Sequence, residues 1–344
     1  MDELKTLIFR TDRLGDFIIS SPFILSYKKN FNNRKIVVIS SEYNYDYIKN
    51  FDFVNEIYSL ENKAKFFPKL IVLFKMILLL RKTKFEHIIV LDGKKRSFFI
   101  SLFLKGKKSI LLQSRGLEFL CKIFQYKRVI NYELQYQLKN FSFLASLLNF
   151  NIDLKQLNIY LNYNFNPSFK LDKKYIIIHL DEKWFTKFYY NDFTDINPNR
   201  NQIEIFIKKI LKTLDDKYDL VLTSGSKKLN VLDEYTKDFE KYDDNKFIKK
   251  INNNSIYYFK NTSFNDLESI IKNSSFLICC EGGVSHVSHN LNIKTIAFYQ
   301  NNRFQHTKYW TGHMKNLSLY ERNSMEEILN DNNFFNLIHK NLVI

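Results

Sequence analysis

Residues 276–299, FLICCEGGVSHVSHNLNIKTIAFY, place two glycines where a phosphate group could bind. The apolar run Phe276–Cys280 predicts a strand, the segment after Gly283 a short helix, and 295–299 a second strand. Glycines at a helix start leave the first backbone N–H groups uncovered, and the helix dipole adds partial positive charge there. The pattern favours a diphosphate site at Gly282 and Gly283, although an ordinary strand-to-helix turn has the same glycines.

Other polar residues of this segment have two interpretations each. Glu281 could accept hydrogen bonds from a sugar or ribose hydroxyl, or from the helix start. His286 could hydrogen-bond near the phosphates or take part in helix packing. His289, three residues on, lies on the same helix face, but no third ligand is near, so we predict no metal site.

A second group of chemically capable residues is the loop RTDRLGD, residues 10–16, after the predicted strand Lys5–Arg10. Asp16 follows Gly15 at a helix start, where a carboxylate can cap backbone N–H groups. It could equally be a general base, because the neighbouring glycine gives a substrate hydroxyl close access. Asp12 is the alternative carboxylate, and a structural role in the turn fits its position.

Basic side chains follow another predicted strand of the same half of the chain. Lys94, Lys95 and Arg96 come after strand 87–91 and Asp92. Such a run is commonly a solvated face, but at the end of a strand it could bind an anionic acceptor.

The second half has its own candidates after its first two strands. Lys183 or Lys187 could neutralise charge on a departing diphosphate, or be an exposed loop lysine, and spacing does not choose between them. Ser224 and Gly225 could lie against a nucleotide or form an ordinary turn.

Strands and helices alternate along both halves, which predicts an α/β protein with two doubly wound parallel sheets. The predicted strands of the first half are 5–10, 36–40, 56–60, 87–91 and 109–112. Those of the second half are 175–179, 219–223, 255–259, 276–280 and 295–299. Predicted helices include 68–81, 135–150, 202–214 and one capped by Ser263 and Asp266. The Asn-rich segment 151–170 reads as a linker, giving domains 1–160 and 161–344, with the cleft between them as the expected site.

Composition limits the partners and the compartment. The 344 residues carry a formal net charge of +16, which favours anionic partners such as phosphorylated ligands or an acidic membrane surface. Three cysteines without a disulfide or zinc spacing fit a reducing compartment. The N-terminus lacks a secretory signal pattern, and the most apolar stretch, 70–80, is shorter than the about 20 residues a bilayer requires. We therefore expect a cytoplasmic protein, peripheral on the cytoplasmic face of the inner membrane.

Two of these patches resemble motifs of one enzyme family. RTDRLGDFIISSP resembles the N-terminal motif of glycosyltransferase family 9, the bacterial ADP-heptose:lipopolysaccharide heptosyltransferases, and residues 259–299 resemble its C-terminal signature. LDGKKRS, residues 91–97, and the helix 135–150 also fall in the expected order. The resemblance spans most of the chain and is dense only in these patches.

The resemblance implies a GT-B fold, with two Rossmann-like domains whose parallel sheets face across a cleft, and sugar transfer with inversion and without a metal. By the same resemblance Asp16 is the base, the first domain binds the acceptor and the second binds the donor. Our candidate acceptor-binding residues are Arg10, Arg13, Gly15, Lys94, Lys95 and Arg96. The resemblance implies Lys183 or Lys187 and the turn Glu281, Gly282, Gly283, Val284 and His286 as donor-binding residues, and Ser224 and Gly225 are further candidates from their place after a strand.

The chain departs from the family pattern at the glycine turn. The family usually has Asp followed by Ser or Thr before the glycine, whereas this chain has Glu281 and Gly282. It also lacks the acidic residue that some members have after the position of Gly225, since Ser226, Lys227 and Lys228 follow.

We predict an inverting glycosyltransferase that moves heptose or a related sugar from a nucleotide-diphosphate donor, such as ADP-heptose, to a hydroxyl of a lipopolysaccharide core or other surface glycan. No cofactor is expected. One alternative is a sugar-nucleotide epimerase or hydrolase on the same fold. A nucleic-acid-binding protein, suggested by the net charge, is disfavoured because the sequence has no Gly-x-x-Gly clamp, zinc pattern or aromatic-basic RNP segment.

Overall fold

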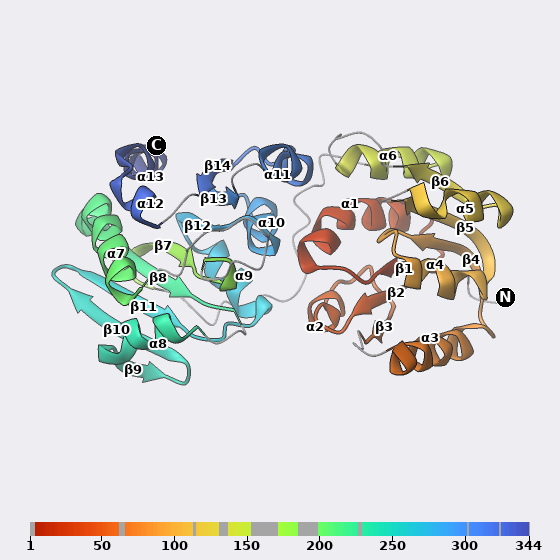
Figure 1. The fold of residues 1–344 in the computed structure, drawn as a ribbon, viewed down its shortest axis with the longest axis horizontal. Coiled ribbons are helices and arrows are strands. Elements are labelled where there is room, and N and C mark those ends of the chain that lie inside the picture. The colour runs from red at the N-terminus through yellow and green to blue at the C-terminus, as the bar shows by residue number, and fades with distance from the viewer. Residues whose placement is uncertain are drawn as a thin grey trace. The chain divides into compact units, whose positions relative to one another are not determined.

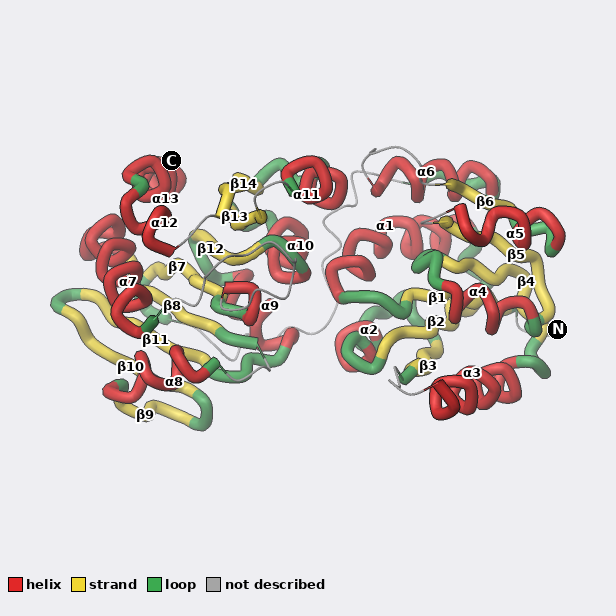
Figure 2. The backbone as a smooth tube through the Cα atoms, in the orientation of Figure 1, coloured by secondary structure: helices red, strands yellow, loops and turns green. Residues whose placement is uncertain are grey.

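The computed structural model describes residues 4–61, 66–112, 115–130, 137–152, 171–184, 199–225, 229–300, 303–322 and 325–343. The chain forms two compact units, Met1–Asn164 and Phe165–Ile344. In each unit helices cover both faces of a sheet (Figures 1 and 2). The predicted domain boundary, between 160 and 161, lies among residues outside the described ranges.

The first unit contains a parallel sheet with the strand order β3-β2-β1-β4-β5-β6. Its strands are β1 (Lys5–Arg10), β2 (Lys35–Ser41), β3 (Glu56–Leu60), β4 (Lys84–Val90), β5 (Lys105–Leu112) and β6 (Lys127–Ile130). The chain order reverses between the paired strands β1 and β4, so the loops that follow them meet at the edge where α/β proteins bind ligands. The short strand β6 was not predicted.

Helices of the first unit form a layer on each face of this sheet. They are α1 (Leu14–Asn30), α2 (Tyr45–Ile48), α3 (Phe66–Leu80), α4 (Lys95–Leu102), α5 (Glu118–Ile123) and α6 (Gln137–Leu147). One apolar core joins α3, α4 and α5 to the sheet. On the other face α1 packs against α6, with the rings of Phe23 and Phe141 6.1 Å apart.

The second unit has a larger sheet with the strand order β14-β13-β12-β7-β8-β11-β10-β9. Its strands are β7 (Lys174–His179), β8 (Tyr218–Thr223), β9 (Glu240–Asp243), β10 (Lys246–Ile251), β11 (Asn254–Phe259), β12 (Phe276–Cys280), β13 (Thr295–Gln300) and β14 (Leu317–Arg322). The strands from β14 to β11 pair in parallel, whereas β10 is antiparallel to β11 and β9. The antiparallel edge was missed because its strands are largely polar and half-exposed, and they turn on Asn residues rather than glycine.

Helices of the second unit also lie on both faces. They are α7 (Arg200–Leu214), α8 (Asn230–Tyr235), α9 (Phe264–Lys272), α10 (Gly283–Asn290), α11 (Phe304–Thr311), α12 (Met325–Asn330) and α13 (Asn332–Val343). The main core joins α7, α8, α12 and α13 to the sheet. Ser263 caps α9 as predicted, accepting a hydrogen bond of 3.2 Å from the Asp266 N–H.

The sheets confirm the predicted α/β class with two Rossmann-like units. None of the helices in the described ranges is both long and apolar enough to cross a membrane.

Candidate active site

Asp92 fastens together the loops that follow β1 and β4. Its buried Oδ2 accepts hydrogen bonds from the Thr11 N–H at 3.1 Å, the Thr11 hydroxyl at 2.6 Å and the Ser97 hydroxyl at 2.6 Å. Its Oδ1 accepts one from the Lys94 N–H at 3.1 Å. Four hydrogen bonds to one buried carboxylate hold both loops in a single geometry.

Arg10 is not available to an acceptor, contrary to the prediction. Its side chain is 0% exposed, and its guanidinium donates to the carbonyl of Leu91 at 2.8 Å and to the carbonyl of Asp16. It also pairs with Asp12 Oδ2 at 3.1 Å. Arg10 therefore positions the first turn of α1 from inside the protein.

Asp16 lies in that first turn of α1 with its carboxylate half-exposed. Its Oδ2 accepts a hydrogen bond of 3.1 Å from the Arg13 N–H, so it does cap the helix start as the alternative interpretation expected. The carboxylate makes no other hydrogen bond to the described residues. One oxygen thus remains for a substrate hydroxyl. Gly15, beside it, is buried in the same turn, and Arg13 is exposed.

Asp12 is the more buried carboxylate of the loop. Burial raises its pKa to about 7, although Arg10 acts in the opposite direction. Its backbone carbonyl accepts hydrogen bonds from Ser41 at 3.1 Å and Asn44 at 2.7 Å, and its buried Oδ1 has no partner among the described residues. Asp12 therefore remains a second candidate proton acceptor.

The three predicted acceptor-binding cations of the β4–α4 loop are not equivalent. Lys94 Nζ and the Arg96 guanidinium both donate to the Thr11 carbonyl, at 3.1 and 2.6 Å, while Lys95 is exposed. Together with Lys69 of α3 they line a hollow of about 300 Å³. Lys69 was not singled out from the sequence, because only the fold brings the first turn of α3 beside this loop.

In the second unit, Lys183 lies against the glycine turn before α10. Its Nζ donates a hydrogen bond of 2.6 Å to the Glu281 carbonyl. Gly282 has φ 154° and ψ −156°, a conformation that side chains disfavour, and a Cβ on it would collide with Lys183 Nζ. The glycine at position 282 therefore leaves room for the Lys183 ammonium.

Lys183 remains a cation at this place. Burial disfavours its charged form, but the carboxylates of Asp181 and Glu281 outweigh burial, so the pKa of Lys183 is raised. Asp181 Oδ2 lies 3.8 Å from Nζ. The next residue, Trp184, is fully buried and donates its indole N–H to the His179 carbonyl at 2.9 Å, which anchors the loop. Lys187 lies outside the described residues.

The other predicted donor-binding residues differ in how exposed their side chains are. Glu281, Gly282 and Gly283 are half-buried at the turn, whereas Val284 and His286 are buried in α10. Ser285 holds the helix start through hydrogen bonds of 3.2 and 2.8 Å with the Gly282 N–H and carbonyl.

Ser224 and Gly225 follow β8, two strands from β12 in the sheet. Ser224 is buried, and its hydroxyl lies 3.2 Å from the Tyr258 hydroxyl and 3.4 Å from the Asn261 nitrogen. This side chain therefore stabilises the turn, as the alternative interpretation expected, and its contact with a donor stays a prediction. Gly225 has open space where a side chain would be, so a ligand can approach it closely. The positions after it, 226–228, lie outside the described residues.

Three histidines cluster behind the glycine turn. His313 has its ring centroid 5.2 Å from that of His289 and 6.3 Å from that of His286. Burial lowers the pKa of His289 to about 4 and that of His313 to about 3, and it lowers the pKa of His286 as well. Neither ring nitrogen of His289 has a hydrogen-bond partner in the described ranges. No group of His, Cys, Asp and Glu among the described residues has an arrangement that could hold a metal ion.

This cluster should make the second unit sensitive to acid. A histidine whose folded pKa lies below its unfolded value of about 6.5 stabilises the fold above pH 6.5 and loses that contribution as the pH falls. The wild type is expected to lose unfolding free energy between pH 7.5 and pH 5. In His289→Leu this loss should be smaller by about 2 kcal/mol. Urea unfolding at both pH values measures this difference, with the exposed His339→Leu as control. An unchanged pH dependence in His289→Leu would contradict it.

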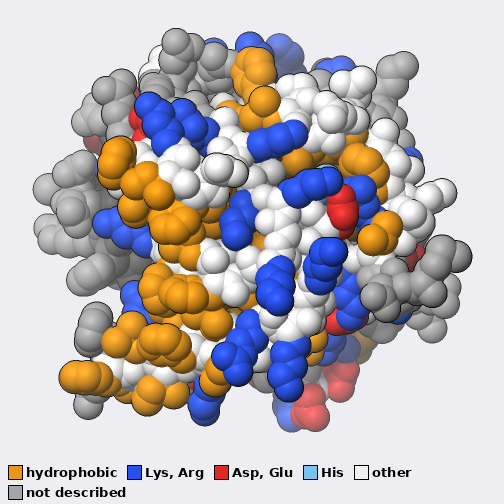
Figure 3. Space-filling view, turned by 90° about the vertical axis from the view of Figure 1, so that its right-hand side faces the viewer, with side chains coloured by type: hydrophobic (Ala, Val, Ile, Leu, Met, Phe, Trp, Pro, Cys, Tyr) orange, Lys and Arg blue, Asp and Glu red, His pale blue; other side chains and the backbone are white. Residues whose placement is uncertain are grey.

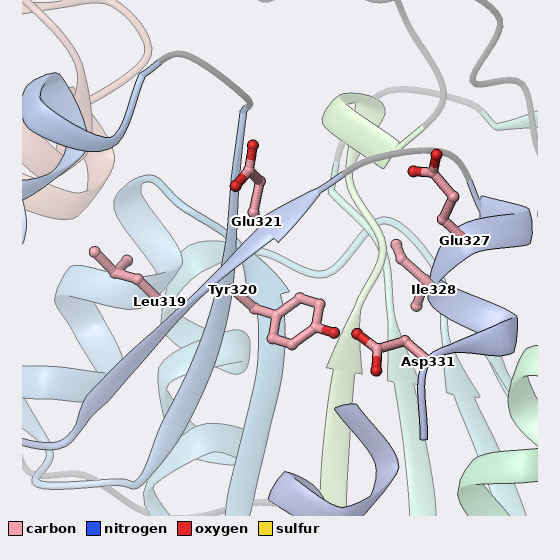
Figure 4. Close-up of a pocket in the computed structure, with 6 residues that line it drawn as sticks. All are labelled: Leu319, Tyr320, Glu321, Glu327, Ile328 and Asp331. Atoms are coloured by element: carbon pink, nitrogen blue, oxygen red, sulfur yellow. The ribbon is translucent and has the colours of Figure 1, made fainter. Parts of the chain in front are cut away.

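A separate hollow of about 360 Å³ in the second unit is unsuited to a diphosphate. Figure 4 shows the carboxylates of Glu321, Glu327 and Asp331 around it, with the Tyr320 hydroxyl directed toward Asp331. Three acidic side chains would repel a phosphate group.

Comparisons with known proteins agree on the fold. No protein-family model and no curated protein sequence matches the chain. Among solved structures, it resembles Escherichia coli heptosyltransferase WaaC with ADP-2-deoxy-2-fluoro heptose, at TM-score 0.71 and 14% identity, covering 98% of this chain and 99% of that one. A glycosyltransferase family 9 protein from Veillonella parvula gives TM-score 0.65 at 13% identity, covering 98% and 99%. A putative UDP-N-acetylglucosamine 2-epimerase from Listeria monocytogenes gives 0.55 at 12%, covering 99% and 91%.

The coverage of both chains is almost complete, and both Rossmann-like units take part in it. The resemblance first seen in two motifs is thus confirmed in the fold, and the chain has the GT-B architecture of the glycosyltransferase family 9 heptosyltransferases.

Proposed function

We propose that this protein is a glycosyltransferase that transfers a sugar from a nucleotide-diphosphate donor. The observation that carries the proposal is the contact of Lys183 Nζ, 2.6 Å from the Glu281 carbonyl, at the glycine turn that opens α10. A half-buried cation beside a helix N-terminus is a fitting place for a diphosphate. The likeness of the fold to heptosyltransferase WaaC supports the same reading.

The proposed reaction inverts the anomeric carbon. An acceptor hydroxyl oxygen attacks this carbon from the face opposite the diphosphate, while Asp16 takes the hydroxyl proton. The bond between the carbon and the diphosphate oxygen breaks, and the electron pair leaves with the diphosphate. Lys183 and the first N–H groups of α10 stabilise that negative charge in place of a metal ion.

The proposed acceptor is an anionic glycan, a lipopolysaccharide core or another surface glycan, bound by the first unit. The hollow lined by Lys69, Lys94, Lys95 and Arg96 supports this assignment, because four cations around one space favour phosphate or carboxylate groups. Arg13 is exposed next to Asp16 and is proposed as a further contact.

The proposed donor is ADP-heptose or a related nucleotide sugar, because WaaC was solved with ADP-2-deoxy-2-fluoro heptose. Glu281, Gly283 and Gly225 are proposed to line the donor site. Val284 and His286 would act from within α10, and Lys187 remains a proposed contact. A cytoplasmic location and the absence of a cofactor belong to the same proposal.

A second candidate is a sugar-nucleotide epimerase or hydrolase. The similarity of the fold to that of the putative UDP-N-acetylglucosamine 2-epimerase is the observation that favours this second function. Such an enzyme converts the donor without any acceptor.

The experiment incubates the protein with a panel of nucleotide-diphosphate sugars, with and without a lipopolysaccharide-core acceptor, in the presence of a chelator. Release of nucleoside diphosphate only when the acceptor is present is the expected result. Conversion of a donor in the absence of acceptor would show epimerisation or hydrolysis and would contradict sugar transfer. Loss of turnover in the chelator would contradict the metal-independent reaction.

A further inference from the structure

The outer face of α3 is apolar and uncovered in the first unit. Phe67 is 77% exposed, and Ile71, Phe74, Leu78 and Leu79 are each more than half exposed. The inner face of the same helix supplies its packing, through Leu73, Met76, Ile77 and Leu80 in the core. The helix therefore exposes large apolar side chains that its own folding does not require, which marks an interaction surface.

This face continues across the neighbouring helices of the same layer. The ring of Phe74 lies 6.4 Å from that of Phe99 on α4, which lies 5.1 Å from that of Phe103. On α5, Phe119 is 71% exposed, and Leu120, Ile123 and Phe124 are exposed as well. We call the exposed side chains of α3, α4 and α5, from Phe67 to Phe124, the α3–α5 face.

The charges on the α3–α5 face are mainly positive, with Glu118 in the first turn of α5 as its acidic side chain. The sequence contains no Asp or Glu between positions 66 and 85 or between 93 and 117, whereas those stretches hold Lys or Arg at 69, 75, 81, 82, 84, 94, 95, 96, 105, 107, 108 and 115. Figure 3 shows apolar patches mixed with many Lys and Arg side chains and few acidic ones at this end of the protein. A surface with this excess of cations favours an anionic partner.

We propose that the α3–α5 face docks on an anionic lipid bilayer. Exposed aromatic and aliphatic side chains can enter the boundary between headgroups and acyl chains, while the surrounding lysines attract anionic headgroups. The basic hollow that includes Lys69 of α3 and Lys95 of α4 lies in the same helix layer. A membrane-embedded anionic acceptor would then reach this hollow from the bilayer. Docking itself does not depend on the proposed sugar transfer.

Vesicle sedimentation tests the charge contribution. Full-length protein is expected to bind vesicles that contain phosphatidylglycerol and to remain unbound with pure phosphatidylcholine. Changing Lys75, Lys82 and Lys122 to Gln lowers the net charge from +16 to +13 and should weaken binding by about a hundredfold, at about fivefold per lysine. The control changes exposed Lys212, Lys237 and Lys250 of the second unit to Gln, with the same loss of charge.

The apolar contribution is tested in the same way. The triple variant Ile71→Ser, Leu78→Ser, Phe119→Ser should weaken vesicle binding by roughly tenfold or more. Its control is Ile205→Ser, Tyr242→Ser, Phe304→Ser, which removes exposed apolar side chains from the second unit. Circular dichroism checks folding, and binding of nucleoside diphosphate should be unchanged in all four variants, which separates docking from the donor site.

Two results would overturn the proposal. One is wild-type protein that stays in the supernatant with anionic vesicles, as expected if a protein partner covers the face instead. The other is equal vesicle binding by the α3–α5 variants and their matched controls.

Discussion

Replacing Asp16 with Asn is expected to lower turnover by about a thousandfold, because general-base catalysis contributes roughly 10²–10⁴ to a rate. The amide oxygen of Asn can still accept the hydrogen bond from the Arg13 N–H, so the start of α1 should keep its geometry. Donor binding is proposed to depend on the second unit, so it should remain nearly intact. Steady-state rates and a donor titration measure the two effects separately.

The neighbouring carboxylate provides the contrast for this experiment. Asp12 is buried and has a raised pKa of about 7, so it is the alternative base if Asp16 only caps the helix. If Asp16→Asn keeps full turnover and Asp12→Asn loses it, Asp12 is the general base. Asp46 is exposed in the first turn of α2. The variant Asp46→Asn is therefore the matched control, because it also removes a carboxylate near the start of a helix.

Replacing Lys183 with Met should lower kcat/KM by about a hundredfold or more and weaken nucleoside diphosphate binding. Methionine fills a similar space but removes the cation from the developing charge of the leaving diphosphate. Lys173→Met, at the other end of β7, removes a lysine that likewise lies near a carboxylate, Asp219, at 3.6 Å. Equal kcat/KM values in both variants would contradict the role of Lys183.

Much of the fold was predictable because the sheets consist of apolar runs. The runs that predicted β7, β8, β11, β12 and β13 match the observed strands to within a residue at each end. The strands β6, β9, β10 and β14 were missed. The segments KRVI, EKYD, KFIKKI and LSLYER contain charged residues, which a search for apolar periodicity assigns to loops. The edge of the second sheet was therefore not predictable from periodicity.

The sequence predicted which segments form the candidate site, but it did not predict the contacts between their residues. Residue spacing identified the glycine turn and the basic loop, because glycines and charges after strands stand out in a sequence. It did not show that Arg10 is buried, that Ser224 is engaged with Tyr258, or that Asp92 fastens two loops. Those outcomes depend on which strands become neighbours, and β1 with β4, or β12 with β7, are far apart in the chain.

Thermal unfolding with nucleoside diphosphates tests the central claim, a diphosphate site at the Gly282 turn beside Lys183, most directly. A ligand at 100 times its dissociation constant stabilises the folded state by about 2.7 kcal/mol. We predict such a stabilisation by at least one nucleoside diphosphate in the wild type and in Lys173→Met, and its loss in Lys183→Met. A panel in which no nucleoside diphosphate stabilises the wild type, or in which Lys183→Met responds as strongly, would contradict the claim.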